Sequence, residues 1–463
     1  MSPKALVAFG VAFIAVLLVF PAAARCSDKN FSDRGISRAF DAKPKTENVE
    51  TRKSTLAYPA LTRKDVLARV LKHNPRLSVS ARDVEARHFE VIQSGLRPNP
   101  ELSVEMENLA GSGEFSGTDS AETTIRISQL FELGAKRSRR QEVGRMAKEV
   151  AARESEIVRA EVMSEASARF TDVLAARKRL SLEQEQVELA TRLLQTVKDQ
   201  IEAGKTAAIE EVRIRGLLFE ARLRQKNARQ KLTAARHVLA SSWGSDSADF
   251  APLEDSFEKT PAAPALSELM SRLEESPRIA LRHSDARKAD RSVALERAEG
   301  IPDLNFSLGA KNDRQSGDNA LVAEVSIPLP IFDRNQGAVA AARSRKMKAE
   351  EAAKFSKTRL RARLAEIWRD LHAAQNEVTV LREEILPASR EAFDGVVYGY
   401  RAGKFGFLDV LEAENALFEA KSRYIEALKS YHKAIADLEH LLGQNLSADG
   451  TFPGPAQKQR GQS

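Results

Sequence analysis

An internal repeat constrains this sequence of 463 residues more than any other feature. The stretch NPRLSVSARDVEAR at 74–87 aligns with SPRIALRHSDARKA at 276–289, at an offset of 202 residues. PELSVEM at 100–106 and PDLNFSL at 302–308 share that offset. Self-similarity of this kind predicts two copies of one structural plan, which differ by small insertions and deletions.

Each half is predicted to contain a pair of short strands. A helix comes first, at about 79–96 and 279–299, and a proline-containing break ends it. Leu102, Val104 and Met106 then alternate with polar residues, which is the period of a half-buried strand. The predicted strands, each pair joined by a polar loop rich in Gly and Ser or Asp, are ~101–110, ~122–131, ~303–311 and ~320–329.

Long helices follow each pair of strands, and a glycine interrupts each of them. We predict helical hairpins over ~136–243 and ~337–443, with Ala-Gly-Lys turns at Gly204 and Gly403 as their tips. The first helix, which no proline interrupts, would span about 100 Å. Its apolar residues recur at every seventh position, at Val173, Leu180, Val187, Leu194 and Ile201. This spacing predicts coiled-coil packing between antiparallel neighbours.

The repeat also sets the predicted organisation of the whole chain. The predicted segments are a signal peptide at 1–24, an extended N-terminal arm at 25–57, the first repeat at 58–245, a linker at 246–265, the second repeat at 266–445 and a disordered tail at 446–463. Lys4, an apolar stretch and small residues at 22–24 are typical of an export signal. A retained membrane anchor and a lipoprotein acylated at Cys26 are the alternatives, and Arg25 opposes acylation because a small residue is needed there.

Composition narrows the class of protein. Charged residues make up 30% of the chain and aromatic residues 6%, a balance that favours long helices over a compact α/β enzyme. The net charge of +7 is spread along the sequence, so nucleic acid is not the expected partner. A single cysteine allows no intrachain disulfide. No phosphate-binding loop, dinucleotide fingerprint or nucleophile–base motif occurs, so we predict neither catalysis nor a cofactor.

The four predicted strands cannot form a channel alone. A barrel with an open lumen needs more than about eight strands, so several chains would have to share one barrel. Two copies would give a barrel filled by side chains, and three would give twelve strands around a lumen. The alternative is a coiled-coil scaffold or periplasmic adaptor without a pore, because long helices rich in Ala, Glu and Arg are common in such proteins.

The sequence resembles the TolC-like outer-membrane efflux channels over about residues 58 to 443. YPALTRKDVLARVLKHNPRL at 58–77 is similar to the opening helix of that family, and YRAGKFGFLDVLEAENALFEA at 400–420 to its C-terminal hairpin. PELSVEMENLAGSGEFSG, AETTIRISQLFELGAKRSR and VSIPLPIFDRNQGAVAAA resemble the cobalt–zinc–cadmium resistance branch.

The resemblance implies a mainly α fold, with a trimer that forms a 12-stranded β-barrel in the outer membrane and an α-helical barrel in the periplasm. It also implies a passive channel that works with a periplasmic adaptor and an inner-membrane proton-driven pump of the resistance–nodulation–division class. Heavy-metal cations are the implied cargo, and drug efflux or type I protein secretion is the alternative.

The resemblance also assigns candidate residues to the helical tips. Asp409 and Glu412 match the acidic constriction of the family, and rings of carboxylates favour cations. A solvated helix face is the alternative interpretation of this pair. Positions that the family uses for gating or adaptor docking are Tyr400, Gly403, Lys404, Gly204, Lys205 and Glu210. One departure is Phe405, where the family has a gating arginine.

The sequence offers no metal site. None of the seven histidines forms a His-x-x-His or Cys/His cluster with ligand spacing. His432 and His440 lie eight residues apart on one predicted helix, where packing or solvation is the expected role. No metal-ligand pattern in the sequence therefore indicates which cargo the protein would carry.

Overall fold

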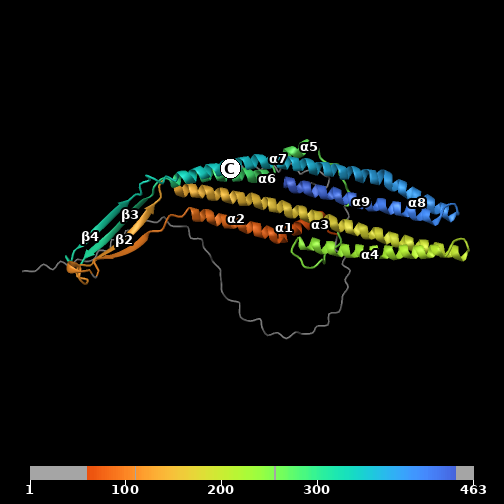
Figure 1. The fold of residues 1–463 in the computed structure, drawn as a ribbon, viewed down its shortest axis with the longest axis horizontal. Coiled ribbons are helices and arrows are strands. Elements are labelled where there is room, and N and C mark those ends of the chain that lie inside the picture. The colour runs from red at the N-terminus through yellow and green to blue at the C-terminus, as the bar shows by residue number, and fades with distance from the viewer. Residues whose placement is uncertain (1–59, 110, 255–256, 445–463) are drawn as a thin grey trace, which may run out of the picture. The chain divides into compact units, whose positions relative to one another are not determined.

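The computed structural model describes residues 60–109, 111–254 and 257–444. The predicted signal peptide, the extended arm, Cys26 and the C-terminal tail lie outside the described residues. The predicted fold class is confirmed, since the chain is mainly helical and carries one small antiparallel sheet at one end of its long helices (Figure 1). No helix in the described ranges is both long enough and apolar enough to cross a membrane.

The elements follow the same order in both halves of the chain. In the first half they are α1 (Arg63–His73), α2 (Pro75–Ser94), β1 (Glu101–Glu107), β2 (Glu122–Phe131), α3 (Lys136–Glu202) and α4 (Ile209–Ser241). In the second half they are α5 (Leu266–Glu274), α6 (Pro277–Glu299), β3 (Leu304–Asp313), β4 (Asn319–Ser326), α7 (Gln336–Val380), α8 (Leu386–Arg401) and α9 (Phe407–Leu442).

Local sequence explains where the helices start. Asn74 caps α2 by accepting a hydrogen bond from the Arg76 amide at 2.8 Å, and a proline occupies the first turn. Ser276 caps α6 in the same way before Pro277. A short polar cap followed by proline suits a helix start, because proline has no amide hydrogen to leave unpaired there.

The four strands form one sheet in the order β1-β2-β3-β4, with every neighbouring pair antiparallel (Figure 1). Its register places apolar side chains in rows across one face. One such row is Leu102, Ile127, Leu308 and Ala323, and another is Val104, Ile125, Ala310 and Leu321. The other face is polar, and there the Arg126 guanidinium lies 3.3 Å from Glu324.

The apolar face of the sheet is uncovered. Leu102 is 70% exposed and Leu321 is 85% exposed, and their neighbours in the rows are also largely exposed. The outer edges of β1 and β4 have no strand partner among the described residues. A contiguous apolar surface of this kind marks a contact with lipid or with another protein.

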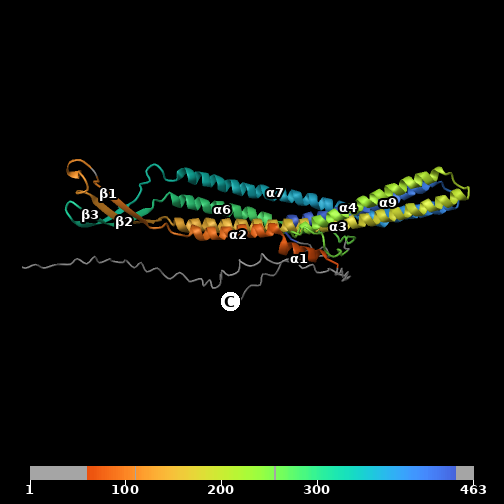
Figure 2. The ribbon, with the colours of Figure 1, turned by 90° about the horizontal axis from the view of Figure 1, so that it is seen from below.

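The helices run side by side as two hairpins. α3 packs against α4, and α9 packs against α7, α8 and α3 (Figures 1 and 2). A π-helical turn at Leu381–Ile385 joins α7 to α8 just before Pro387. Proline removes one amide donor from the helical ladder, so a widened turn at this point lets the helix continue past Pro387.

The core consists of three buried apolar clusters along the helices. One joins α1, α3 and α9, a second joins α5, α7 and α9, and a third lies near the hairpin tips. Residues between the two repeats also pack inward, with Leu253 4% exposed and Phe257 fully buried. The described part of the predicted linker is therefore fixed against the helices.

Candidate gate at the helical tips

Both hairpins turn through the same hydrogen-bonded motif. Gly204 and Gly403 have φ angles of 68° and 73°, in the left-handed region that glycine adopts without strain. The Lys205 amide donates to the Gln200 carbonyl at 2.8 Å, and the Lys404 amide makes the equivalent bond at the same distance. This pattern is the Schellman motif, which satisfies the last carbonyls of a helix.

Tyr400 joins the two hairpins near their tips. Its hydroxyl donates a hydrogen bond to Gln200 Oε1 at 2.7 Å, which links α8 to α3. The residue is 7% exposed, and its burial raises the pKa of the Tyr400 phenol. The sequence selected Tyr400 for a gating contact but missed Gln200, which no motif distinguishes from the other glutamines of α3.

Glu210, another residue that the resemblance assigns to gating or adaptor docking, makes its hydrogen bond within its own helix. Its Oε1 accepts a hydrogen bond from Arg213 at 2.9 Å, within the first turns of α4. Its Oε2 is buried and has no hydrogen-bond partner in the described part of the chain. The structure therefore brings Glu210 close to the tip without a bond to α8.

Asp409 and Glu412 lie on one exposed face in the first turns of α9. Asp409 Oδ2 accepts a hydrogen bond from the Gly406 amide at 2.7 Å, which caps the helix and fixes the carboxylate. Neither carboxylate has an ion pair with another side chain of the described ranges. Two uncompensated carboxylates thus stand at the end of the hairpin.

Phe405 occupies the place of the family's arginine and packs within its own chain. A Cβ atom built on Gly399 would lie 2.2 Å from the Phe405 ring, so the ring fits against α8 only because residue 399 is glycine. About half of the Phe405 side chain stays exposed. The Phe405 ring therefore packs against α8 at the turn.

An apolar cluster holds the two tips together behind these residues. Its buried members are Leu193, Val197, Ile214, Phe393, Tyr400, Phe407, Val410 and Leu417. They come from α3, α4, α8 and α9, so the inner packing of the tips does not depend on the exposed carboxylates. The rings of Tyr400 and Phe407 lie 6.1 Å apart between their centroids.

Four of the seven histidines are exposed, and His432 and His440 are partly buried on α9. His432 Nε2 lies 2.8 Å from the Phe257 carbonyl oxygen, and burial lowers the pKa of the His432 imidazole. Burial and Arg278 lower the pKa of His440. Among the described residues, no three His, Cys, Asp or Glu side chains gather in a group that could hold a metal ion.

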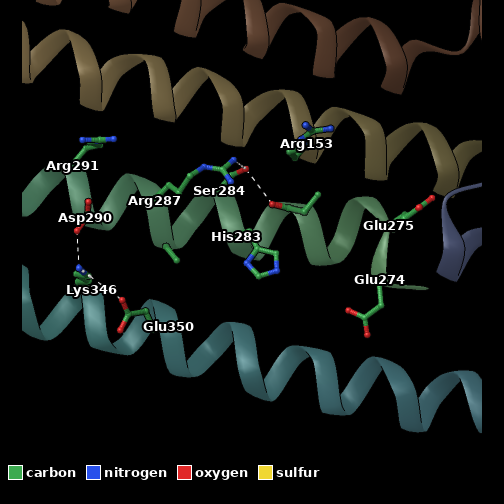
Figure 3. Close-up of a pocket in the computed structure, with 12 residues that line it drawn as sticks. Arg153, Glu274, Glu275, His283, Ser284, Arg287, Asp290, Arg291, Lys346 and Glu350 are labelled. Atoms are coloured by element: carbon green, nitrogen blue, oxygen red, sulfur yellow. Dashed lines mark hydrogen bonds and ion pairs between the residues drawn. The ribbon is translucent and has the colours of Figure 1, made fainter. Parts of the chain in front are cut away.

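A second candidate site is a groove of about 700 Å³ beside α6 and α7 (Figure 3). Lys346 Nζ lies 2.7 Å from Asp290 Oδ1, so the pKa of the Asp290 carboxyl is lowered and that of the Lys346 ammonium is raised. The Ser284 hydroxyl donates to Glu149 at 3.0 Å. Acidic and basic side chains line the groove in largely equal measure, so the groove has no preference for one sign of charge.

Paired helical hairpins carry a small sheet with an exposed apolar face, an arrangement that suits a protein in contact with a membrane. The family model described as "Outer membrane efflux protein" matches residues 66–245 and 269–444. The chain belongs to the outer membrane efflux protein family. This membership confirms the resemblance that the sequence motifs indicated. It also confirms the predicted location in the outer membrane.

Individual relatives support the same assignment. The cobalt-zinc-cadmium resistance protein CzcC of Cupriavidus metallidurans is 32% identical over 384 residues, which cover 83% of this chain and 90% of that protein. The nickel-cobalt-cadmium resistance protein NccC of Alcaligenes xylosoxydans xylosoxydans is 26% identical over 300 residues, covering 65% and 67%. A solved membrane protein from Pseudomonas aeruginosa has the same fold, with a TM-score of 0.71, 18% identity, and coverage of 84% of this chain and 91% of that one.

Proposed function

We propose that three copies of this chain form one passive channel for the export of heavy-metal cations. The uncovered apolar face of an open-edged, four-stranded sheet carries this proposal. In a lipid bilayer every backbone donor and acceptor must be paired, so the free edges of β1 and β4 have to be closed. Because the strands alternate in direction, β4 of one copy meets β1 of the next in antiparallel orientation, and closure continues the same pairing.

Three copies suit a channel better than two. A barrel of about eight strands is filled by its own side chains, whereas twelve leave a lumen. The long hairpins of three copies would then enclose a periplasmic α-helical tunnel. In this arrangement the chain performs no chemistry and needs no cofactor.

The helical tips would form the narrow end of that tunnel. We assign Asp409 and Glu412 to the constriction, because these exposed carboxylates have no compensating charge and would form rings in a trimer. Gly204, Lys205, Gly403 and Lys404 would contact the periplasmic adaptor, and Tyr400 would hold the tip through Gln200. Glu210, with one buried oxygen free, would rearrange during gating.

The relatives favour metal cations as cargo. CzcC is described as a cobalt-zinc-cadmium resistance protein and NccC as a nickel-cobalt-cadmium resistance protein. The cargo would be delivered by an inner-membrane proton-driven pump and its adaptor. Selectivity among metals would then belong to the pump.

Two measurements test the proposal. In planar bilayers, the variant Asp409→Asn with Glu412→Gln should lower the preference for cations, and an unchanged reversal potential in a salt gradient would remove both residues from the constriction. In a host lacking this gene, tolerance to cobalt, zinc or cadmium should fall and be restored by the chain. Unchanged metal tolerance with lost drug tolerance would contradict the proposed cargo.

A further inference from the structure

An exposed apolar stripe runs along the outer face of α4. Ile209, Val212, Phe219 and Leu223 are each more than half exposed. Together with Gly216 they recur at alternating spacings of three and four residues, which is the spacing of a coiled-coil seam. The opposite face of α4 already packs against α3. The stripe therefore suits a further helix that lies outside α4.

A second exposed face with the same spacing lies on α8. Its members are Ala388, Glu391 and Gly395, which are mostly small residues. The other face of α8 packs against α9. The order of helices across the two hairpins is α4, α3, α9 and α8, so the two exposed faces lie at opposite edges of one copy (Figure 1).

Each of these faces contains a glycine that the packing of its own chain does not require. A Cβ atom built on Gly216 or on Gly395 would meet no other atom within 4 Å. Both glycines lie inside helices, where glycine is less favourable than alanine. A helix without side chains at such a point allows the close approach of another helix, which gives these glycines a reason.

The tips of the two hairpins are level with each other. Gln200 and Tyr400, which lie four and three residues before the tip glycines Gly204 and Gly403, are joined by a hydrogen bond of 2.7 Å. Rotation about an axis parallel to the helices keeps all tips of a symmetric ring at this height. Residues at equal distance from a tip are therefore level when α4 of one copy meets α8 of the next.

The two faces match at equal distances from the tips. The level pairs are Val212 with Gly395 at 8 residues, Gly216 with Glu391 at 12, and Phe219 with Ala388 at 15. In each pair a larger side chain faces a smaller one. Such alternation lets the side chains of neighbouring helices interdigitate.

Charge favours the same pairing. Glu384 and Glu391 of α8 are exposed, and neither has an ion pair with another side chain of the described ranges. On α4, Arg215 and Arg222 lie one residue from the positions that are level with these glutamates. Arg222 is exposed, and Arg215 is 3.7 Å from Glu211 of its own helix. Opposite charges beside an apolar seam set the choice and orientation of a partner helix.

We propose that a second copy of this chain covers the α4 stripe, with α4 of one copy antiparallel to α8 of the next. This inference rests on the proposed function, because it states which helices of neighbouring copies pack in that channel. The contact joins two different faces, so it repeats from copy to copy until the ring closes.

Disulfide cross-linking in outer membranes tests this pairing. The variant Gly216→Cys with Glu391→Cys should form linked trimers on a gel without reductant, because a disulfide needs Cβ atoms about 4 Å apart. Gly216→Cys and Glu391→Cys alone are the matched controls and should give no linked trimers, since each also keeps Cys26. If intact trimers form without links in the double variant, the stripe has another partner and the inference is overturned.

Charge reversal provides a second test that keeps both glycines in place. Arg215→Glu and Glu391→Arg should each lower the fraction of trimer that native mass spectrometry detects in detergent. The two changes together should restore most of that fraction. Equal trimer fractions in all four proteins would overturn the inference.

Failure of the proposed function gives a different result. Linked copies that conduct no ions in planar bilayers would refute the channel and leave the contact between α4 and α8 in place. Conducting trimers that never link would refute only this contact.

Discussion

Replacing Tyr400 with phenylalanine should open the channel while leaving the fold intact. The change removes one hydroxyl, which donates to Gln200 at 2.7 Å in a site that is 7% exposed. A bond of this kind contributes about 1 kcal/mol. The free energies of three well-separated bonds add, so a trimer that opens in one concerted step loses about 3 kcal/mol of its preference for the state in which Tyr400 is bonded to Gln200. That loss changes the ratio of the two states by roughly 100-fold, since about 1.4 kcal/mol is a factor of ten.

Single-channel recording in planar bilayers measures this ratio. Tyr400→Phe should spend more time at high conductance, whereas Tyr398→Phe provides the control, because Tyr398 is 75% exposed and lies two residues away on α8. Thr206, whose hydroxyl lies 3.4 Å from Gln200 Oε1, can replace part of the lost bond and lower the effect. If both variants match wild type in conductance, the bond between α8 and α3 does not hold the gate.

Three further changes test the packing and the buried charges. Gly443→Ala should lower the unfolding temperature in detergent more than Gly403→Ala, because both glycines have positive φ but only the first would place a Cβ 2.5 Å from Pro277; equal losses would contradict this. Burial raises the pKa of Glu414 above 4.5, so its contribution to stability is present below pH 4.5 and is lost as pH rises through the folded pKa. The stability of Glu414→Gln relative to wild type should therefore grow as pH rises from 4.5, and a pH-independent difference would refute it. Burial lowers the pKa of His432 below 6.5, so its contribution to folding stability is present above pH 6.5 and is lost as pH falls through the folded pKa. The variant His432→Gln should therefore lose less stability than wild type on acidification. The same dependence of stability on pH in both proteins would contradict this.

The sequence predicted the fold class because local signals and the repeat agree. The glycines at 204 and 403 end helices through their own backbone freedom, and the alternation at Leu102 and Val104 fixes a strand face without knowledge of its neighbours. These features depend on residues close together in the chain.

The contacts of the candidate gate could not be predicted in the same way. Gln200 and Tyr400 are 200 residues apart, and their bond depends on how α3 and α8 rotate about their axes. The burial of Glu183 and Glu414 likewise appears only once the helices are packed together.

The number of chains in the membrane complex tests the central claim most directly. Native mass spectrometry of protein extracted from outer membranes in detergent should give three mature chains, and the same preparation should conduct cations in bilayers. A monomer or dimer that stays in water without detergent would contradict the account, because four strands with two free edges would then be stable unclosed.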